Sequence, residues 1–454
     1  MGQSKGVDSQ RACARRERRD EVQQDIESYK YYVSIDCMTI SEGVYRIELL
    51  KHRNMALKGE DYIDQEYYVY NCQFFRLLGL WEYQRSLKQF FYVCTINIFI
   101  AIGLYQQIYM LLTSKGHIKS ITKLLEITLP TLCFGSCYYN LLLNGVIMKQ
   151  IMHRIKCDWD DLATKPELII LKKFSQLSRL CTITIAICFY LYIAFLVFPS
   201  LLCNIRYIYG AINETELLLP IYYDVKTQMV YYMELLMQWI NITILCTVGI
   251  ANYSMFIAVI QHACALFNII IWRVNERFKK ESHDSYQSSM KAELIEENEW
   301  IIGIIQFYNN TIEFVNLIKE FYERSHLFEI FLATIFIMID YFYVLQILSF
   351  DLTNIERLTN MCYIVASLFC IYAYFHFGQK LIDNSVNVSM AFRQIPFYVL
   401  SLKTQKVLLF LIMKSMRQCN LTVEGMKEIS HYLFAMIMRS SFSFAMVFYN
   451  LKQI

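Results

Sequence analysis

Polar residues interrupt the apolar stretch close to the C-terminus, and they are Arg439, Ser440, Ser441, Ser443 and Asn450. Side chains of this kind at membrane depth usually face a water-filled cavity or a partner helix rather than lipid. Ser443, Val447 and Leu451 are spaced by four residues, so a helix presents them on one face. A polar rung followed by two apolar rungs suits a dewetting gate, because water leaves a narrow apolar ring and ions stop there. The alternative is an ordinary buried helix whose serines hydrogen-bond to their own backbone.

Three further ionisable residues lie within apolar stretches. A carboxylate such as Asp340 is costly at mid-bilayer and must pair, stay protonated or face water. We expect Asp340 to bond to a neighbouring helix, and the alternative is a contribution to a cation path. His262 and His376 are predicted to pack between helices rather than to bind a ligand. The sequence has no metal-ligand cluster, nucleophile motif or phosphate loop, which argues against an enzyme and predicts no cofactor and no metal site.

The composition indicates which elements position these residues. Of 454 residues, 56% are hydrophobic and only 18% are charged, which excludes intrinsic disorder and is unusual for a water-soluble chain. The net charge is only +3 and the basic residues are scattered, so nucleic acid is not an expected partner. The 34 tyrosines and 31 phenylalanines suit a chain surrounded by membrane lipid. The sequence therefore predicts a helical membrane protein.

Seven stretches are long enough to cross a bilayer, which takes about 20 mostly apolar residues. They cover 89–114, 127–148, 180–205, 235–272, 330–350, 358–379 and 424–451. The last stretch is the least hydrophobic of the seven. The predicted fold is an all-α membrane protein with seven transmembrane helices.

Lysine and arginine are concentrated on one side of these spans. With a cytoplasmic N-terminus, the inner segments hold 26 of these residues and the outer loops hold 6; the inner segments are 51–88, 149–179, 273–329 and 380–417. By the positive-inside rule, the N-terminus is cytoplasmic and the C-terminus extracellular. Asn213 begins a glycosylation sequon in the longest outer loop, where it is a candidate for modification.

Four regions are expected along the chain. Residues 1–60 are polar and form either a disordered cytoplasmic extension or an upstream artefact of the gene model, with Met55 as the natural start. Residues 61–399 hold six of the spans. Residues 400–417 form an apolar and basic cytoplasmic helix, and residues 424–454 form the seventh membrane helix.

Residues 293–325 carry apolar side chains at close to the helical period, with polar residues on much of the other face. Such a helix either extends a membrane helix beyond the bilayer or packs against an equivalent helix from a neighbouring chain. Together with 150–179 and 400–417, it is enough to build a compact intracellular domain of helix ends.

Two short motifs, one before the first span and one after the sixth, resemble those of one receptor family. Residues Leu78-Gly79-Leu80-Trp81 match an aromatic-rich leader, although Glu82 stands where the family has proline. A second, spaced motif follows the sixth span and consists of Gly378, Ser385, Val388, Ala391 and Phe392. The tryptophan-tyrosine pair that the family has next is replaced here by Phe397-Tyr398.

The C-terminal helix gives the strongest match. Leu421-Thr422 and Gly425 precede the run Ile-Met-Arg-Ser-Ser-Phe-Ser-Phe at 437–444, where the family reads Ile-Leu-Lys-x-Ser-Tyr-Ser-Tyr. Every substitution in this run is chemically conservative. Over roughly residues 60–454, the chain therefore resembles the insect odorant receptor family.

The resemblance implies an odorant-gated, non-selective cation channel in the plasma membrane of olfactory sensory neurons. Family members assemble as four subunits around one pore, usually with the shared odorant co-receptor, and their inner helix ends form an anchor domain. The co-receptor's last helix ends in Val-Leu-Val-Gln-Leu-Lys, which residues 447–452 resemble. This match assigns the gate to Val447 and Leu451 and the polar lining beside it to Asn450. The chain lacks the co-receptor's long insertion between the fourth and fifth spans and so resembles a ligand-tuning subunit.

In the family, the ligand pocket lies in the outer half of each subunit, among the second to sixth spans. A small, volatile and largely apolar ligand requires an apolar pocket with aromatic walls and few polar anchors. The candidate lining residues here are Leu132, Phe134, Tyr138, Tyr190, Phe195, Tyr232, Met233, Leu236, Tyr341 and Tyr363. Ordinary helix packing is the alternative for each of them.

Two other receptor families share parts of this pattern. A G-protein-coupled receptor also has seven helices, but it places its N-terminus outside and its last span carries Asn-Pro-x-x-Tyr, which is absent from this sequence. Gustatory receptors end with Thr-Tyr, several apolar residues and Gln-Phe, a pattern that Ser443-Phe444 and Asn450-Leu451 fit loosely. A gustatory receptor-like ligand-gated channel is therefore the closer alternative.

Overall fold

The computed structural model describes residues 68–80, 87–113, 118–209, 228–281, 290–349, 354–423 and 427–453. All of them belong to one compact unit, Tyr67–Ile454. Residues 1–60, Trp81, Asn213 and Gly425 lie outside the described residues, so the expectations for them remain predictions.

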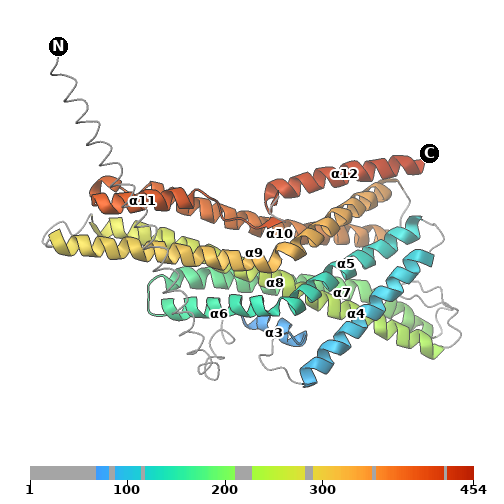
Figure 1. The fold of residues 1–454 in the computed structure, drawn as a ribbon. Coiled ribbons are helices and arrows are strands. Elements are labelled where there is room, and N and C mark those ends of the chain that lie inside the picture. The colour runs from blue at the N-terminus through green and yellow to red at the C-terminus, as the bar shows by residue number, and fades with distance from the viewer. Residues whose placement is uncertain are drawn as a thin grey trace, which may run out of the picture. The chain divides into compact units, whose positions relative to one another are not determined.

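The described part of the chain is almost entirely helical, which confirms the predicted all-α class (Figure 1). Its α-helices are α3 (Val69–Leu77), α4 (Leu87–Thr113), α5 (Ile118–Leu143), α6 (Gly145–Leu162), α7 (Leu168–Ile208), α8 (Gln228–Glu281), α9 (Met290–Ser349), α10 (Asn354–Arg393), α11 (Leu402–Ser415) and α12 (His431–Gln453). A 3-10 turn occupies Phe397–Val399, and two short strands, β1 (Thr422–Val423) and β2 (Lys427–Glu428), pair antiparallel.

Helices cover all seven predicted spans, but they differ in how well they suit a bilayer. Within the described residues, four segments are long and apolar enough to cross: Gln89–Thr113, Leu168–Leu191, Tyr231–Lys279 and Ser325–Phe342. A fifth arises if α5 and α6, which meet at an angle of 73°, count as one broken span. Because α10 and α12 carry more polar residues, the number of seven crossings and the orientation of the termini remain predictions.

Helix α8 forms the centre of the bundle. It packs against α7, α10, α5 and α9, and 89% of its most apolar window is buried inside the chain. A helix that is apolar on all sides must be buried in this way or lie in lipid. Helix α4 is also apolar but leaves Phe90, Phe91, Tyr105 and Leu112 exposed, as expected of a helix that faces lipid.

Helix α3 ends in a glycine turn at the first family motif. The N–H groups of Gly79 and Leu80 donate to the carbonyls of Arg76 and Phe75, which is the Schellman arrangement that closes many helices. Gly79 has φ +69°, a left-handed conformation that favours glycine. A Cβ at this position would also come within 2.8 Å of the Tyr92 ring. The motif therefore needs its glycine for both backbone conformation and packing.

The predicted span 127–148 is interrupted at Asn144. There the chain bends by 73°, and Asn144 Nδ2 donates to Asn140 Oδ1 at 2.7 Å. Helix α6 thus leaves the direction of α5 and packs against α9.

Helix α9 runs without a break over residues 290–349, so the predicted helix 293–325 extends a membrane helix. Helix α11 lies beside it and beside α10. Ser401 caps α11 by accepting a hydrogen bond from Thr404 N, while its own N–H and hydroxyl donate to Glu297 Oε1 at 2.9 and 3.0 Å. The carboxylate of α9 therefore fixes where α11 begins.

Helix α12 begins at His431, later than the expected position 424. Residues before it form the short β1–β2 ladder, in which Thr422 pairs with Glu428 and Val423 with Lys427. Ser430 Oγ then accepts a hydrogen bond from Leu433 N, so Ser430 caps the helix.

Candidate functional site

The predicted gate face of α12 is not covered by the part of the chain that the structure describes. Ser443, Val447 and Asn450 are exposed, and Val447 is 55% exposed. On the opposite face Ser441 and Ala445 are buried. Leu451 belongs to the same helix, but its side chain is not among those described. An apolar residue between two polar ones is thus left available to neighbouring subunits or to water.

Helix α12 is attached to α9 by its buried face. Ser441 Oγ donates to the Thr334 carbonyl at 3.0 Å, and the rings of Tyr341 and Phe442 meet edge to face with centroids 5.3 Å apart. Asp340, next to Tyr341, is buried and accepts a hydrogen bond from Ser367 of α10. That bond is the helix-to-helix contact expected of Asp340.

The start of α12 rests on α10. His431 stacks on the rings of His376 and Tyr372, with centroids 5.5 and 5.7 Å apart, and His431 N donates to Gln379 Oε1. A Cβ at Gly378 would lie 2.5 Å from the Ile429 carbonyl oxygen, so only glycine allows the chain to pass this close. The glycine of the second family motif therefore forms the seat of α12.

The serine of the same motif holds the link between α11 and α12. Cys419 N donates to Ser385 Oγ at 2.9 Å, and Val388 and Phe392 on the same helix are buried. Burial raises the pKa of the Cys419 thiol, so this side chain stays neutral. The motif positions thus support α12 from the C-terminal half of α10, a role that the motif match alone did not reveal.

The ten predicted ligand-lining residues do not form one surface. Leu132, Phe134 and Tyr138 of α5, Tyr232 of α8 and Tyr341 of α9 are buried or half-buried. Tyr190 of α7 and Met233 and Leu236 of α8 are exposed. Phe195 and Tyr363 lie on α7 and α10, but their side chains are outside the described set.

Phe134 belongs to an aromatic cluster between α5, α7 and α8. The rings of Phe134, Phe189 and Tyr253 lie 5.8 to 6.5 Å apart. Gly249 of α8 faces two of them, because a Cβ there would lie 2.9 Å from Phe134 Cε1 and 3.0 Å from Phe189 Cε1. We call these four residues, together with the Tyr190–Thr247 pair that joins α7 to α8, the aromatic cluster.

The hydroxyl pair Tyr190–Thr247 of the aromatic cluster has a defined hydrogen-bond direction. Thr247 Oγ1 donates its single hydrogen to the Thr243 carbonyl at 2.8 Å. The hydroxyl of Tyr190, 3.3 Å from Thr247 Oγ1, must therefore be the donor in this contact. This leaves the Tyr190 oxygen free to accept a hydrogen bond from a ligand.

Sequence reasoning missed Phe189, Thr247, Gly249 and Tyr253. A lone glycine inside the apolar stretch 235–272 was the one signal that could have pointed to this part of α8, because such a glycine often marks a close approach. Leu132, in contrast, packs with Leu129 and Ile339 in a separate apolar core between α5, α9 and α10. The ring of Tyr341 contacts Phe442 of α12.

A buried carboxylate, that of Glu329, lies between α5, α8 and α9. Glu329 Oε1 accepts a hydrogen bond from Cys137 Sγ at 3.4 Å, and Asn252 Nδ2 donates to the same sulfur at 3.3 Å. Glu329 is 5% exposed. It was counted with the inner segment 273–329, because a charge was taken to end the apolar stretch.

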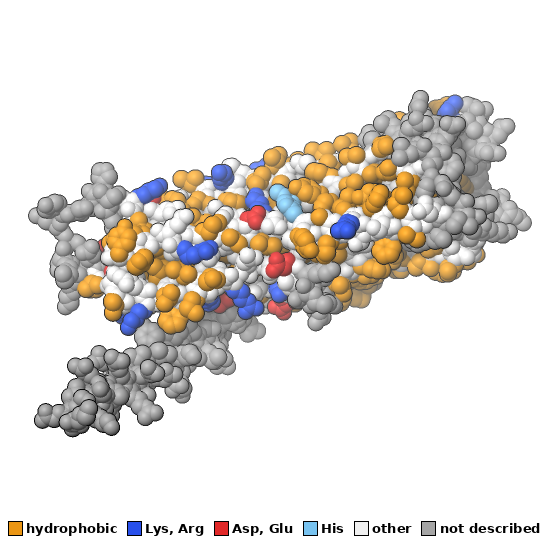
Figure 2. Space-filling model, turned by 90° about the horizontal axis from the view of Figure 1, so that it is seen from above, with side chains coloured by type: hydrophobic (Ala, Val, Ile, Leu, Met, Phe, Trp, Pro, Cys, Tyr) orange, Lys and Arg blue, Asp and Glu red, His pale blue; other side chains and the backbone are white. Residues whose placement is uncertain are grey.

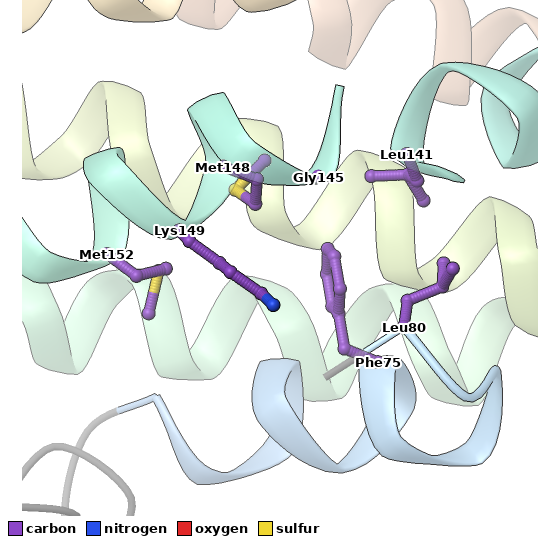
Figure 3. A pocket seen from close by; sticks show the side chains of 7 residues that line it. All are labelled: Phe75, Leu80, Leu141, Gly145, Met148, Lys149 and Met152. Atoms are coloured by element: carbon purple, nitrogen blue, oxygen red, sulfur yellow. The ribbon is translucent and has the colours of Figure 1, made fainter. Parts of the chain in front are cut away.

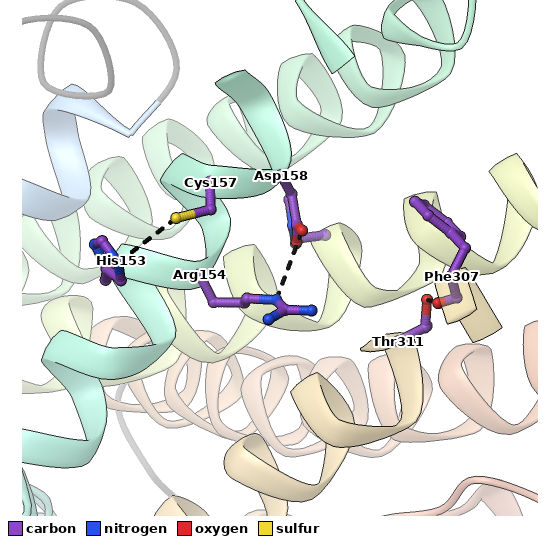
Figure 4. Close-up of polar contacts among 7 residues, drawn as sticks. His153, Arg154, Cys157, Asp158, Phe307 and Thr311 are labelled. Carbon is purple, nitrogen blue, oxygen red and sulfur yellow. Dashed lines mark hydrogen bonds and ion pairs between the residues drawn. The ribbon is translucent and has the colours of Figure 1, made fainter. Parts of the chain in front are cut away.

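A second polar layer ties α6 to α8 and α9. His262 Nε2 lies 3.0 Å from Asp158 Oδ2. The other carboxylate oxygen of Asp158 is 3.7 Å from Arg154 Nε, an ion pair within α6 (Figure 4). The His262 ring also packs on Phe314 of α9 at 5.2 Å, in agreement with a packing role. Arg273 Nε binds Glu167 Oε1 at 3.0 Å.

The surface separates into a polar and an apolar part. Seen from above, Lys, Arg, Asp and Glu side chains gather over the half that holds α11, and hydrophobic side chains predominate toward α12 (Figure 2). Such a division suits a chain whose one end is in water and whose other end is in lipid.

Comparisons with known proteins agree with this arrangement. A family model described as 7tm Odorant receptor matches residues 137–442. The fold is similar to the structure of the insect olfactory receptor OR5 from Machilis hrabei, with a TM-score of 0.64 and 12% identity, covering 86% of this chain and 99% of that one. The structure of the same receptor in complex with eugenol gives a TM-score of 0.65 and 11% identity over 85% and 99% of the two chains. A comparison with curated protein sequences gave no significant match.

Proposed function

Because the chain belongs to the 7tm odorant receptor family, we propose that it is the odorant-sensing subunit of an odorant-gated, non-selective cation channel. In this proposal it assembles with the odorant co-receptor as a tetramer in the plasma membrane of olfactory sensory neurons. The single observation that carries the proposal is the uncovered face of α12, with Ser443, Val447 and Asn450.

The pore assignment follows from what that face needs. Val447 is 55% exposed on a helix whose other face is bonded to α9. Serine and asparagine on either side of it are poorly suited to lipid but suit an aqueous path. Four such faces around one axis would form a ring of valines that closes the path by excluding water.

The aromatic cluster is the proposed ligand site. Its walls are the rings of Phe134, Phe189 and Tyr253, and its polar anchor is the Tyr190 hydroxyl. Small apolar ligands bind such sites mainly through area and shape, with few polar groups to orient them. Eugenol, a small phenol, is bound in one similar structure, and a volatile of this type is the class of ligand that we propose.

Ligand binding would act by a population shift. A ligand can favour the open arrangement only by as much as it prefers that arrangement over the closed one. We propose that a ligand bound at the aromatic cluster moves α8 and α9. Helix α12 then follows because Ser441 and Phe442 hold it to α9.

Co-expression with the co-receptor tests the proposal. The full chain is expressed in cells with the co-receptor, volatiles are applied, and inward cation current is recorded. Each subunit expressed alone is the control. We expect current only for some volatiles and only when this chain is present. Well-expressed complexes that respond to no volatile in a broad panel, or that respond identically without this chain, would overturn it.

A further inference from the structure

The hollow between α3 and the α5–α6 bend has room only for a water molecule (Figure 3). Its walls are Phe75, Leu80, Leu141, Gly145, Met148, Lys149 and Met152. Its volume of about 10 Å³ corresponds to a single water, so an organic ligand does not fit. Side chains that could bind a small ion are found instead on the surface, where α12 begins beside α10.

Three aromatic rings meet where α12 is seated on α10. Tyr372 and His376 belong to α10, and His431 is the first residue of α12. The three ring centroids lie 5.5 to 5.9 Å from one another, and the ring planes are within 27° of parallel. Because each pair is separated by nearly the same distance, the rings form a triangle rather than a column. The two imidazoles are therefore direct neighbours.

The ring nitrogens of His376 and His431 are available to a ligand. Both side chains are exposed, and within the described residues their ring nitrogens make no hydrogen bonds. His431 uses its backbone N–H, which donates to Gln379 Oε1 at 3.3 Å. A neutral imidazole has one nitrogen with a free lone pair, which can bind a metal ion. Figure 2 shows histidine side chains on this face where the charged half of the surface meets the apolar half.

The charges around the histidine pair permit a bound cation. Asp383 lies on the same face of α10 as His376, two helical turns later, and accepts a hydrogen bond from Gln379 Nε2 at 2.8 Å. Lys380, one turn after His376, donates to Gln261 Oε1 of α8 at 3.2 Å. Its ammonium group is therefore held against α8, while the carboxylate of Asp383 provides negative charge on this part of α10.

We propose that His376 and His431 together bind one Zn²⁺ or a similar transition-metal ion, which joins the start of α12 to α10. Imidazole nitrogen is a preferred zinc ligand. Two imidazoles on one tetrahedral zinc have ring centroids about 5 Å apart, close to the 5.5 Å between these two rings. Rotation of the exposed rings about χ2 can turn one nitrogen of each toward a shared ion. Within the described residues no third His, Cys, Asp or Glu joins the pair, so water completes the coordination.

The fold, and not a sequence motif, creates this pair. The two histidines belong to different helices and match no metal-binding spacing, which is why the sequence predicted no metal site. They meet because Gly378 lets the residues before α12 pass close to α10. A site with two protein ligands holds zinc less firmly than the closed four-ligand sites that zinc uses for structure. The ion would therefore be reversible, and its binding would strengthen the seat of α12.

The test uses the full-length chain in the assembly in which it is isolated, purified through a tag that contains no histidine. Binding of Zn²⁺ and of Mg²⁺ is measured by calorimetry, and thermal unfolding is followed with and without each ion. We expect Zn²⁺ to bind and to raise the unfolding temperature, and Mg²⁺ to do neither, because Mg²⁺ prefers oxygen ligands. His376→Gln and His431→Gln should each weaken zinc binding about tenfold or more.

His431→Phe separates metal binding from ring packing. It keeps a ring beside Tyr372 and His376 but has no ligating atom, so it should unfold like the wild type without zinc and lose the response to zinc. His153→Gln, at an exposed histidine of α6, is the matched control and should bind zinc as the wild type does. Zinc binding that is unchanged in His376→Gln or His431→Phe, or an equal response to Mg²⁺, would overturn the site. Because no odorant response is measured, this result is independent of the proposed channel function.

Discussion

The ring of Tyr341 in α9 meets the ring of Phe442 in α12 edge to face, with the centroids 5.3 Å apart. Tyr341 is one of the residues predicted to line a ligand pocket, and its ring contacts the helix with the candidate gate. The residue directly before Phe442, Ser441, is bonded to the backbone of the same helix α9. Movement of α9 therefore has a direct path to α12.

The Tyr341–Phe442 contact is expected to transmit ligand binding to the gate. Aromatic pairs of this kind contribute about 0.5–1.5 kcal/mol beyond their buried area. Tyr341→Ala and Phe442→Ala should each raise the odorant concentration needed for half-maximal current, and the double variant should be less impaired than the two effects added together. Tyr432→Ala, at an exposed position of α12, is the control. Strictly additive effects would show that the two rings act separately.

Val447→Ser should produce current without odorant. A polar side chain keeps water in the narrow ring, so the closed state loses its barrier to ions. The measurement is basal inward current at matched surface expression, with the co-receptor present. Met446→Ser, at the neighbouring half-buried position, should leave the basal current low. A silent Val447→Ser channel that still opens with odorant would remove Val447 from the gate.

Tyr190→Phe should select between ligands by their hydrogen-bonding group. The Tyr190 oxygen can accept a hydrogen bond, because its hydrogen is used toward Thr247. Losing one such bond costs about 1 kcal/mol, or about fivefold in potency. We expect this loss for a volatile phenol or alcohol and no change for its methyl ether. The comparison is a pair of dose–response curves for each variant, and equal losses for both ligands would contradict the proposed anchor.

Gly378→Ala should loosen the seat of α12. The added Cβ would lie 2.5 Å from the Ile429 carbonyl oxygen, and this backbone atom cannot rotate away as a flexible side chain can. Overpacking of this type costs about 1–3 kcal/mol. We expect a lower unfolding temperature of the purified protein. The matched control is Gly303→Ala in α9, where a Cβ meets no atom within 4 Å and better helix propensity should slightly stabilise the chain. Equal stability of the two variants would argue against the seat.

The helices were predictable because long apolar runs have few alternatives in a membrane protein. The bend at Asn144 was not, since it depends on hydrogen bonding within the turn rather than on hydrophobicity. Glu329 was assigned to a cytoplasmic segment because its partner, Cys137, lies far away in the sequence. Charge alone does not reveal a buried carboxylate.

The candidate site was predictable only in part. The four-residue spacing put Ser443 and Val447 on one face of α12, and the structure leaves that face uncovered. Spacing could not show which side of α5, α7 or α8 faces inward, because aromatic residues occur on every side of these helices. As a result Phe134 was among the predicted pocket residues, while Gly249 and Tyr253, which lie next to it, were missed.

State-dependent modification of Val447→Cys tests the central claim most directly. The variant is co-expressed with the co-receptor, and a cationic thiol reagent is applied with and without odorant, with the unmodified chain and its native cysteines as control. A pore-lining gate predicts irreversible change of the current that is much faster in the presence of odorant and is absent from the control. A Val447→Cys channel with normal odorant responses that the reagent leaves unchanged in both states would contradict a pore built from α12.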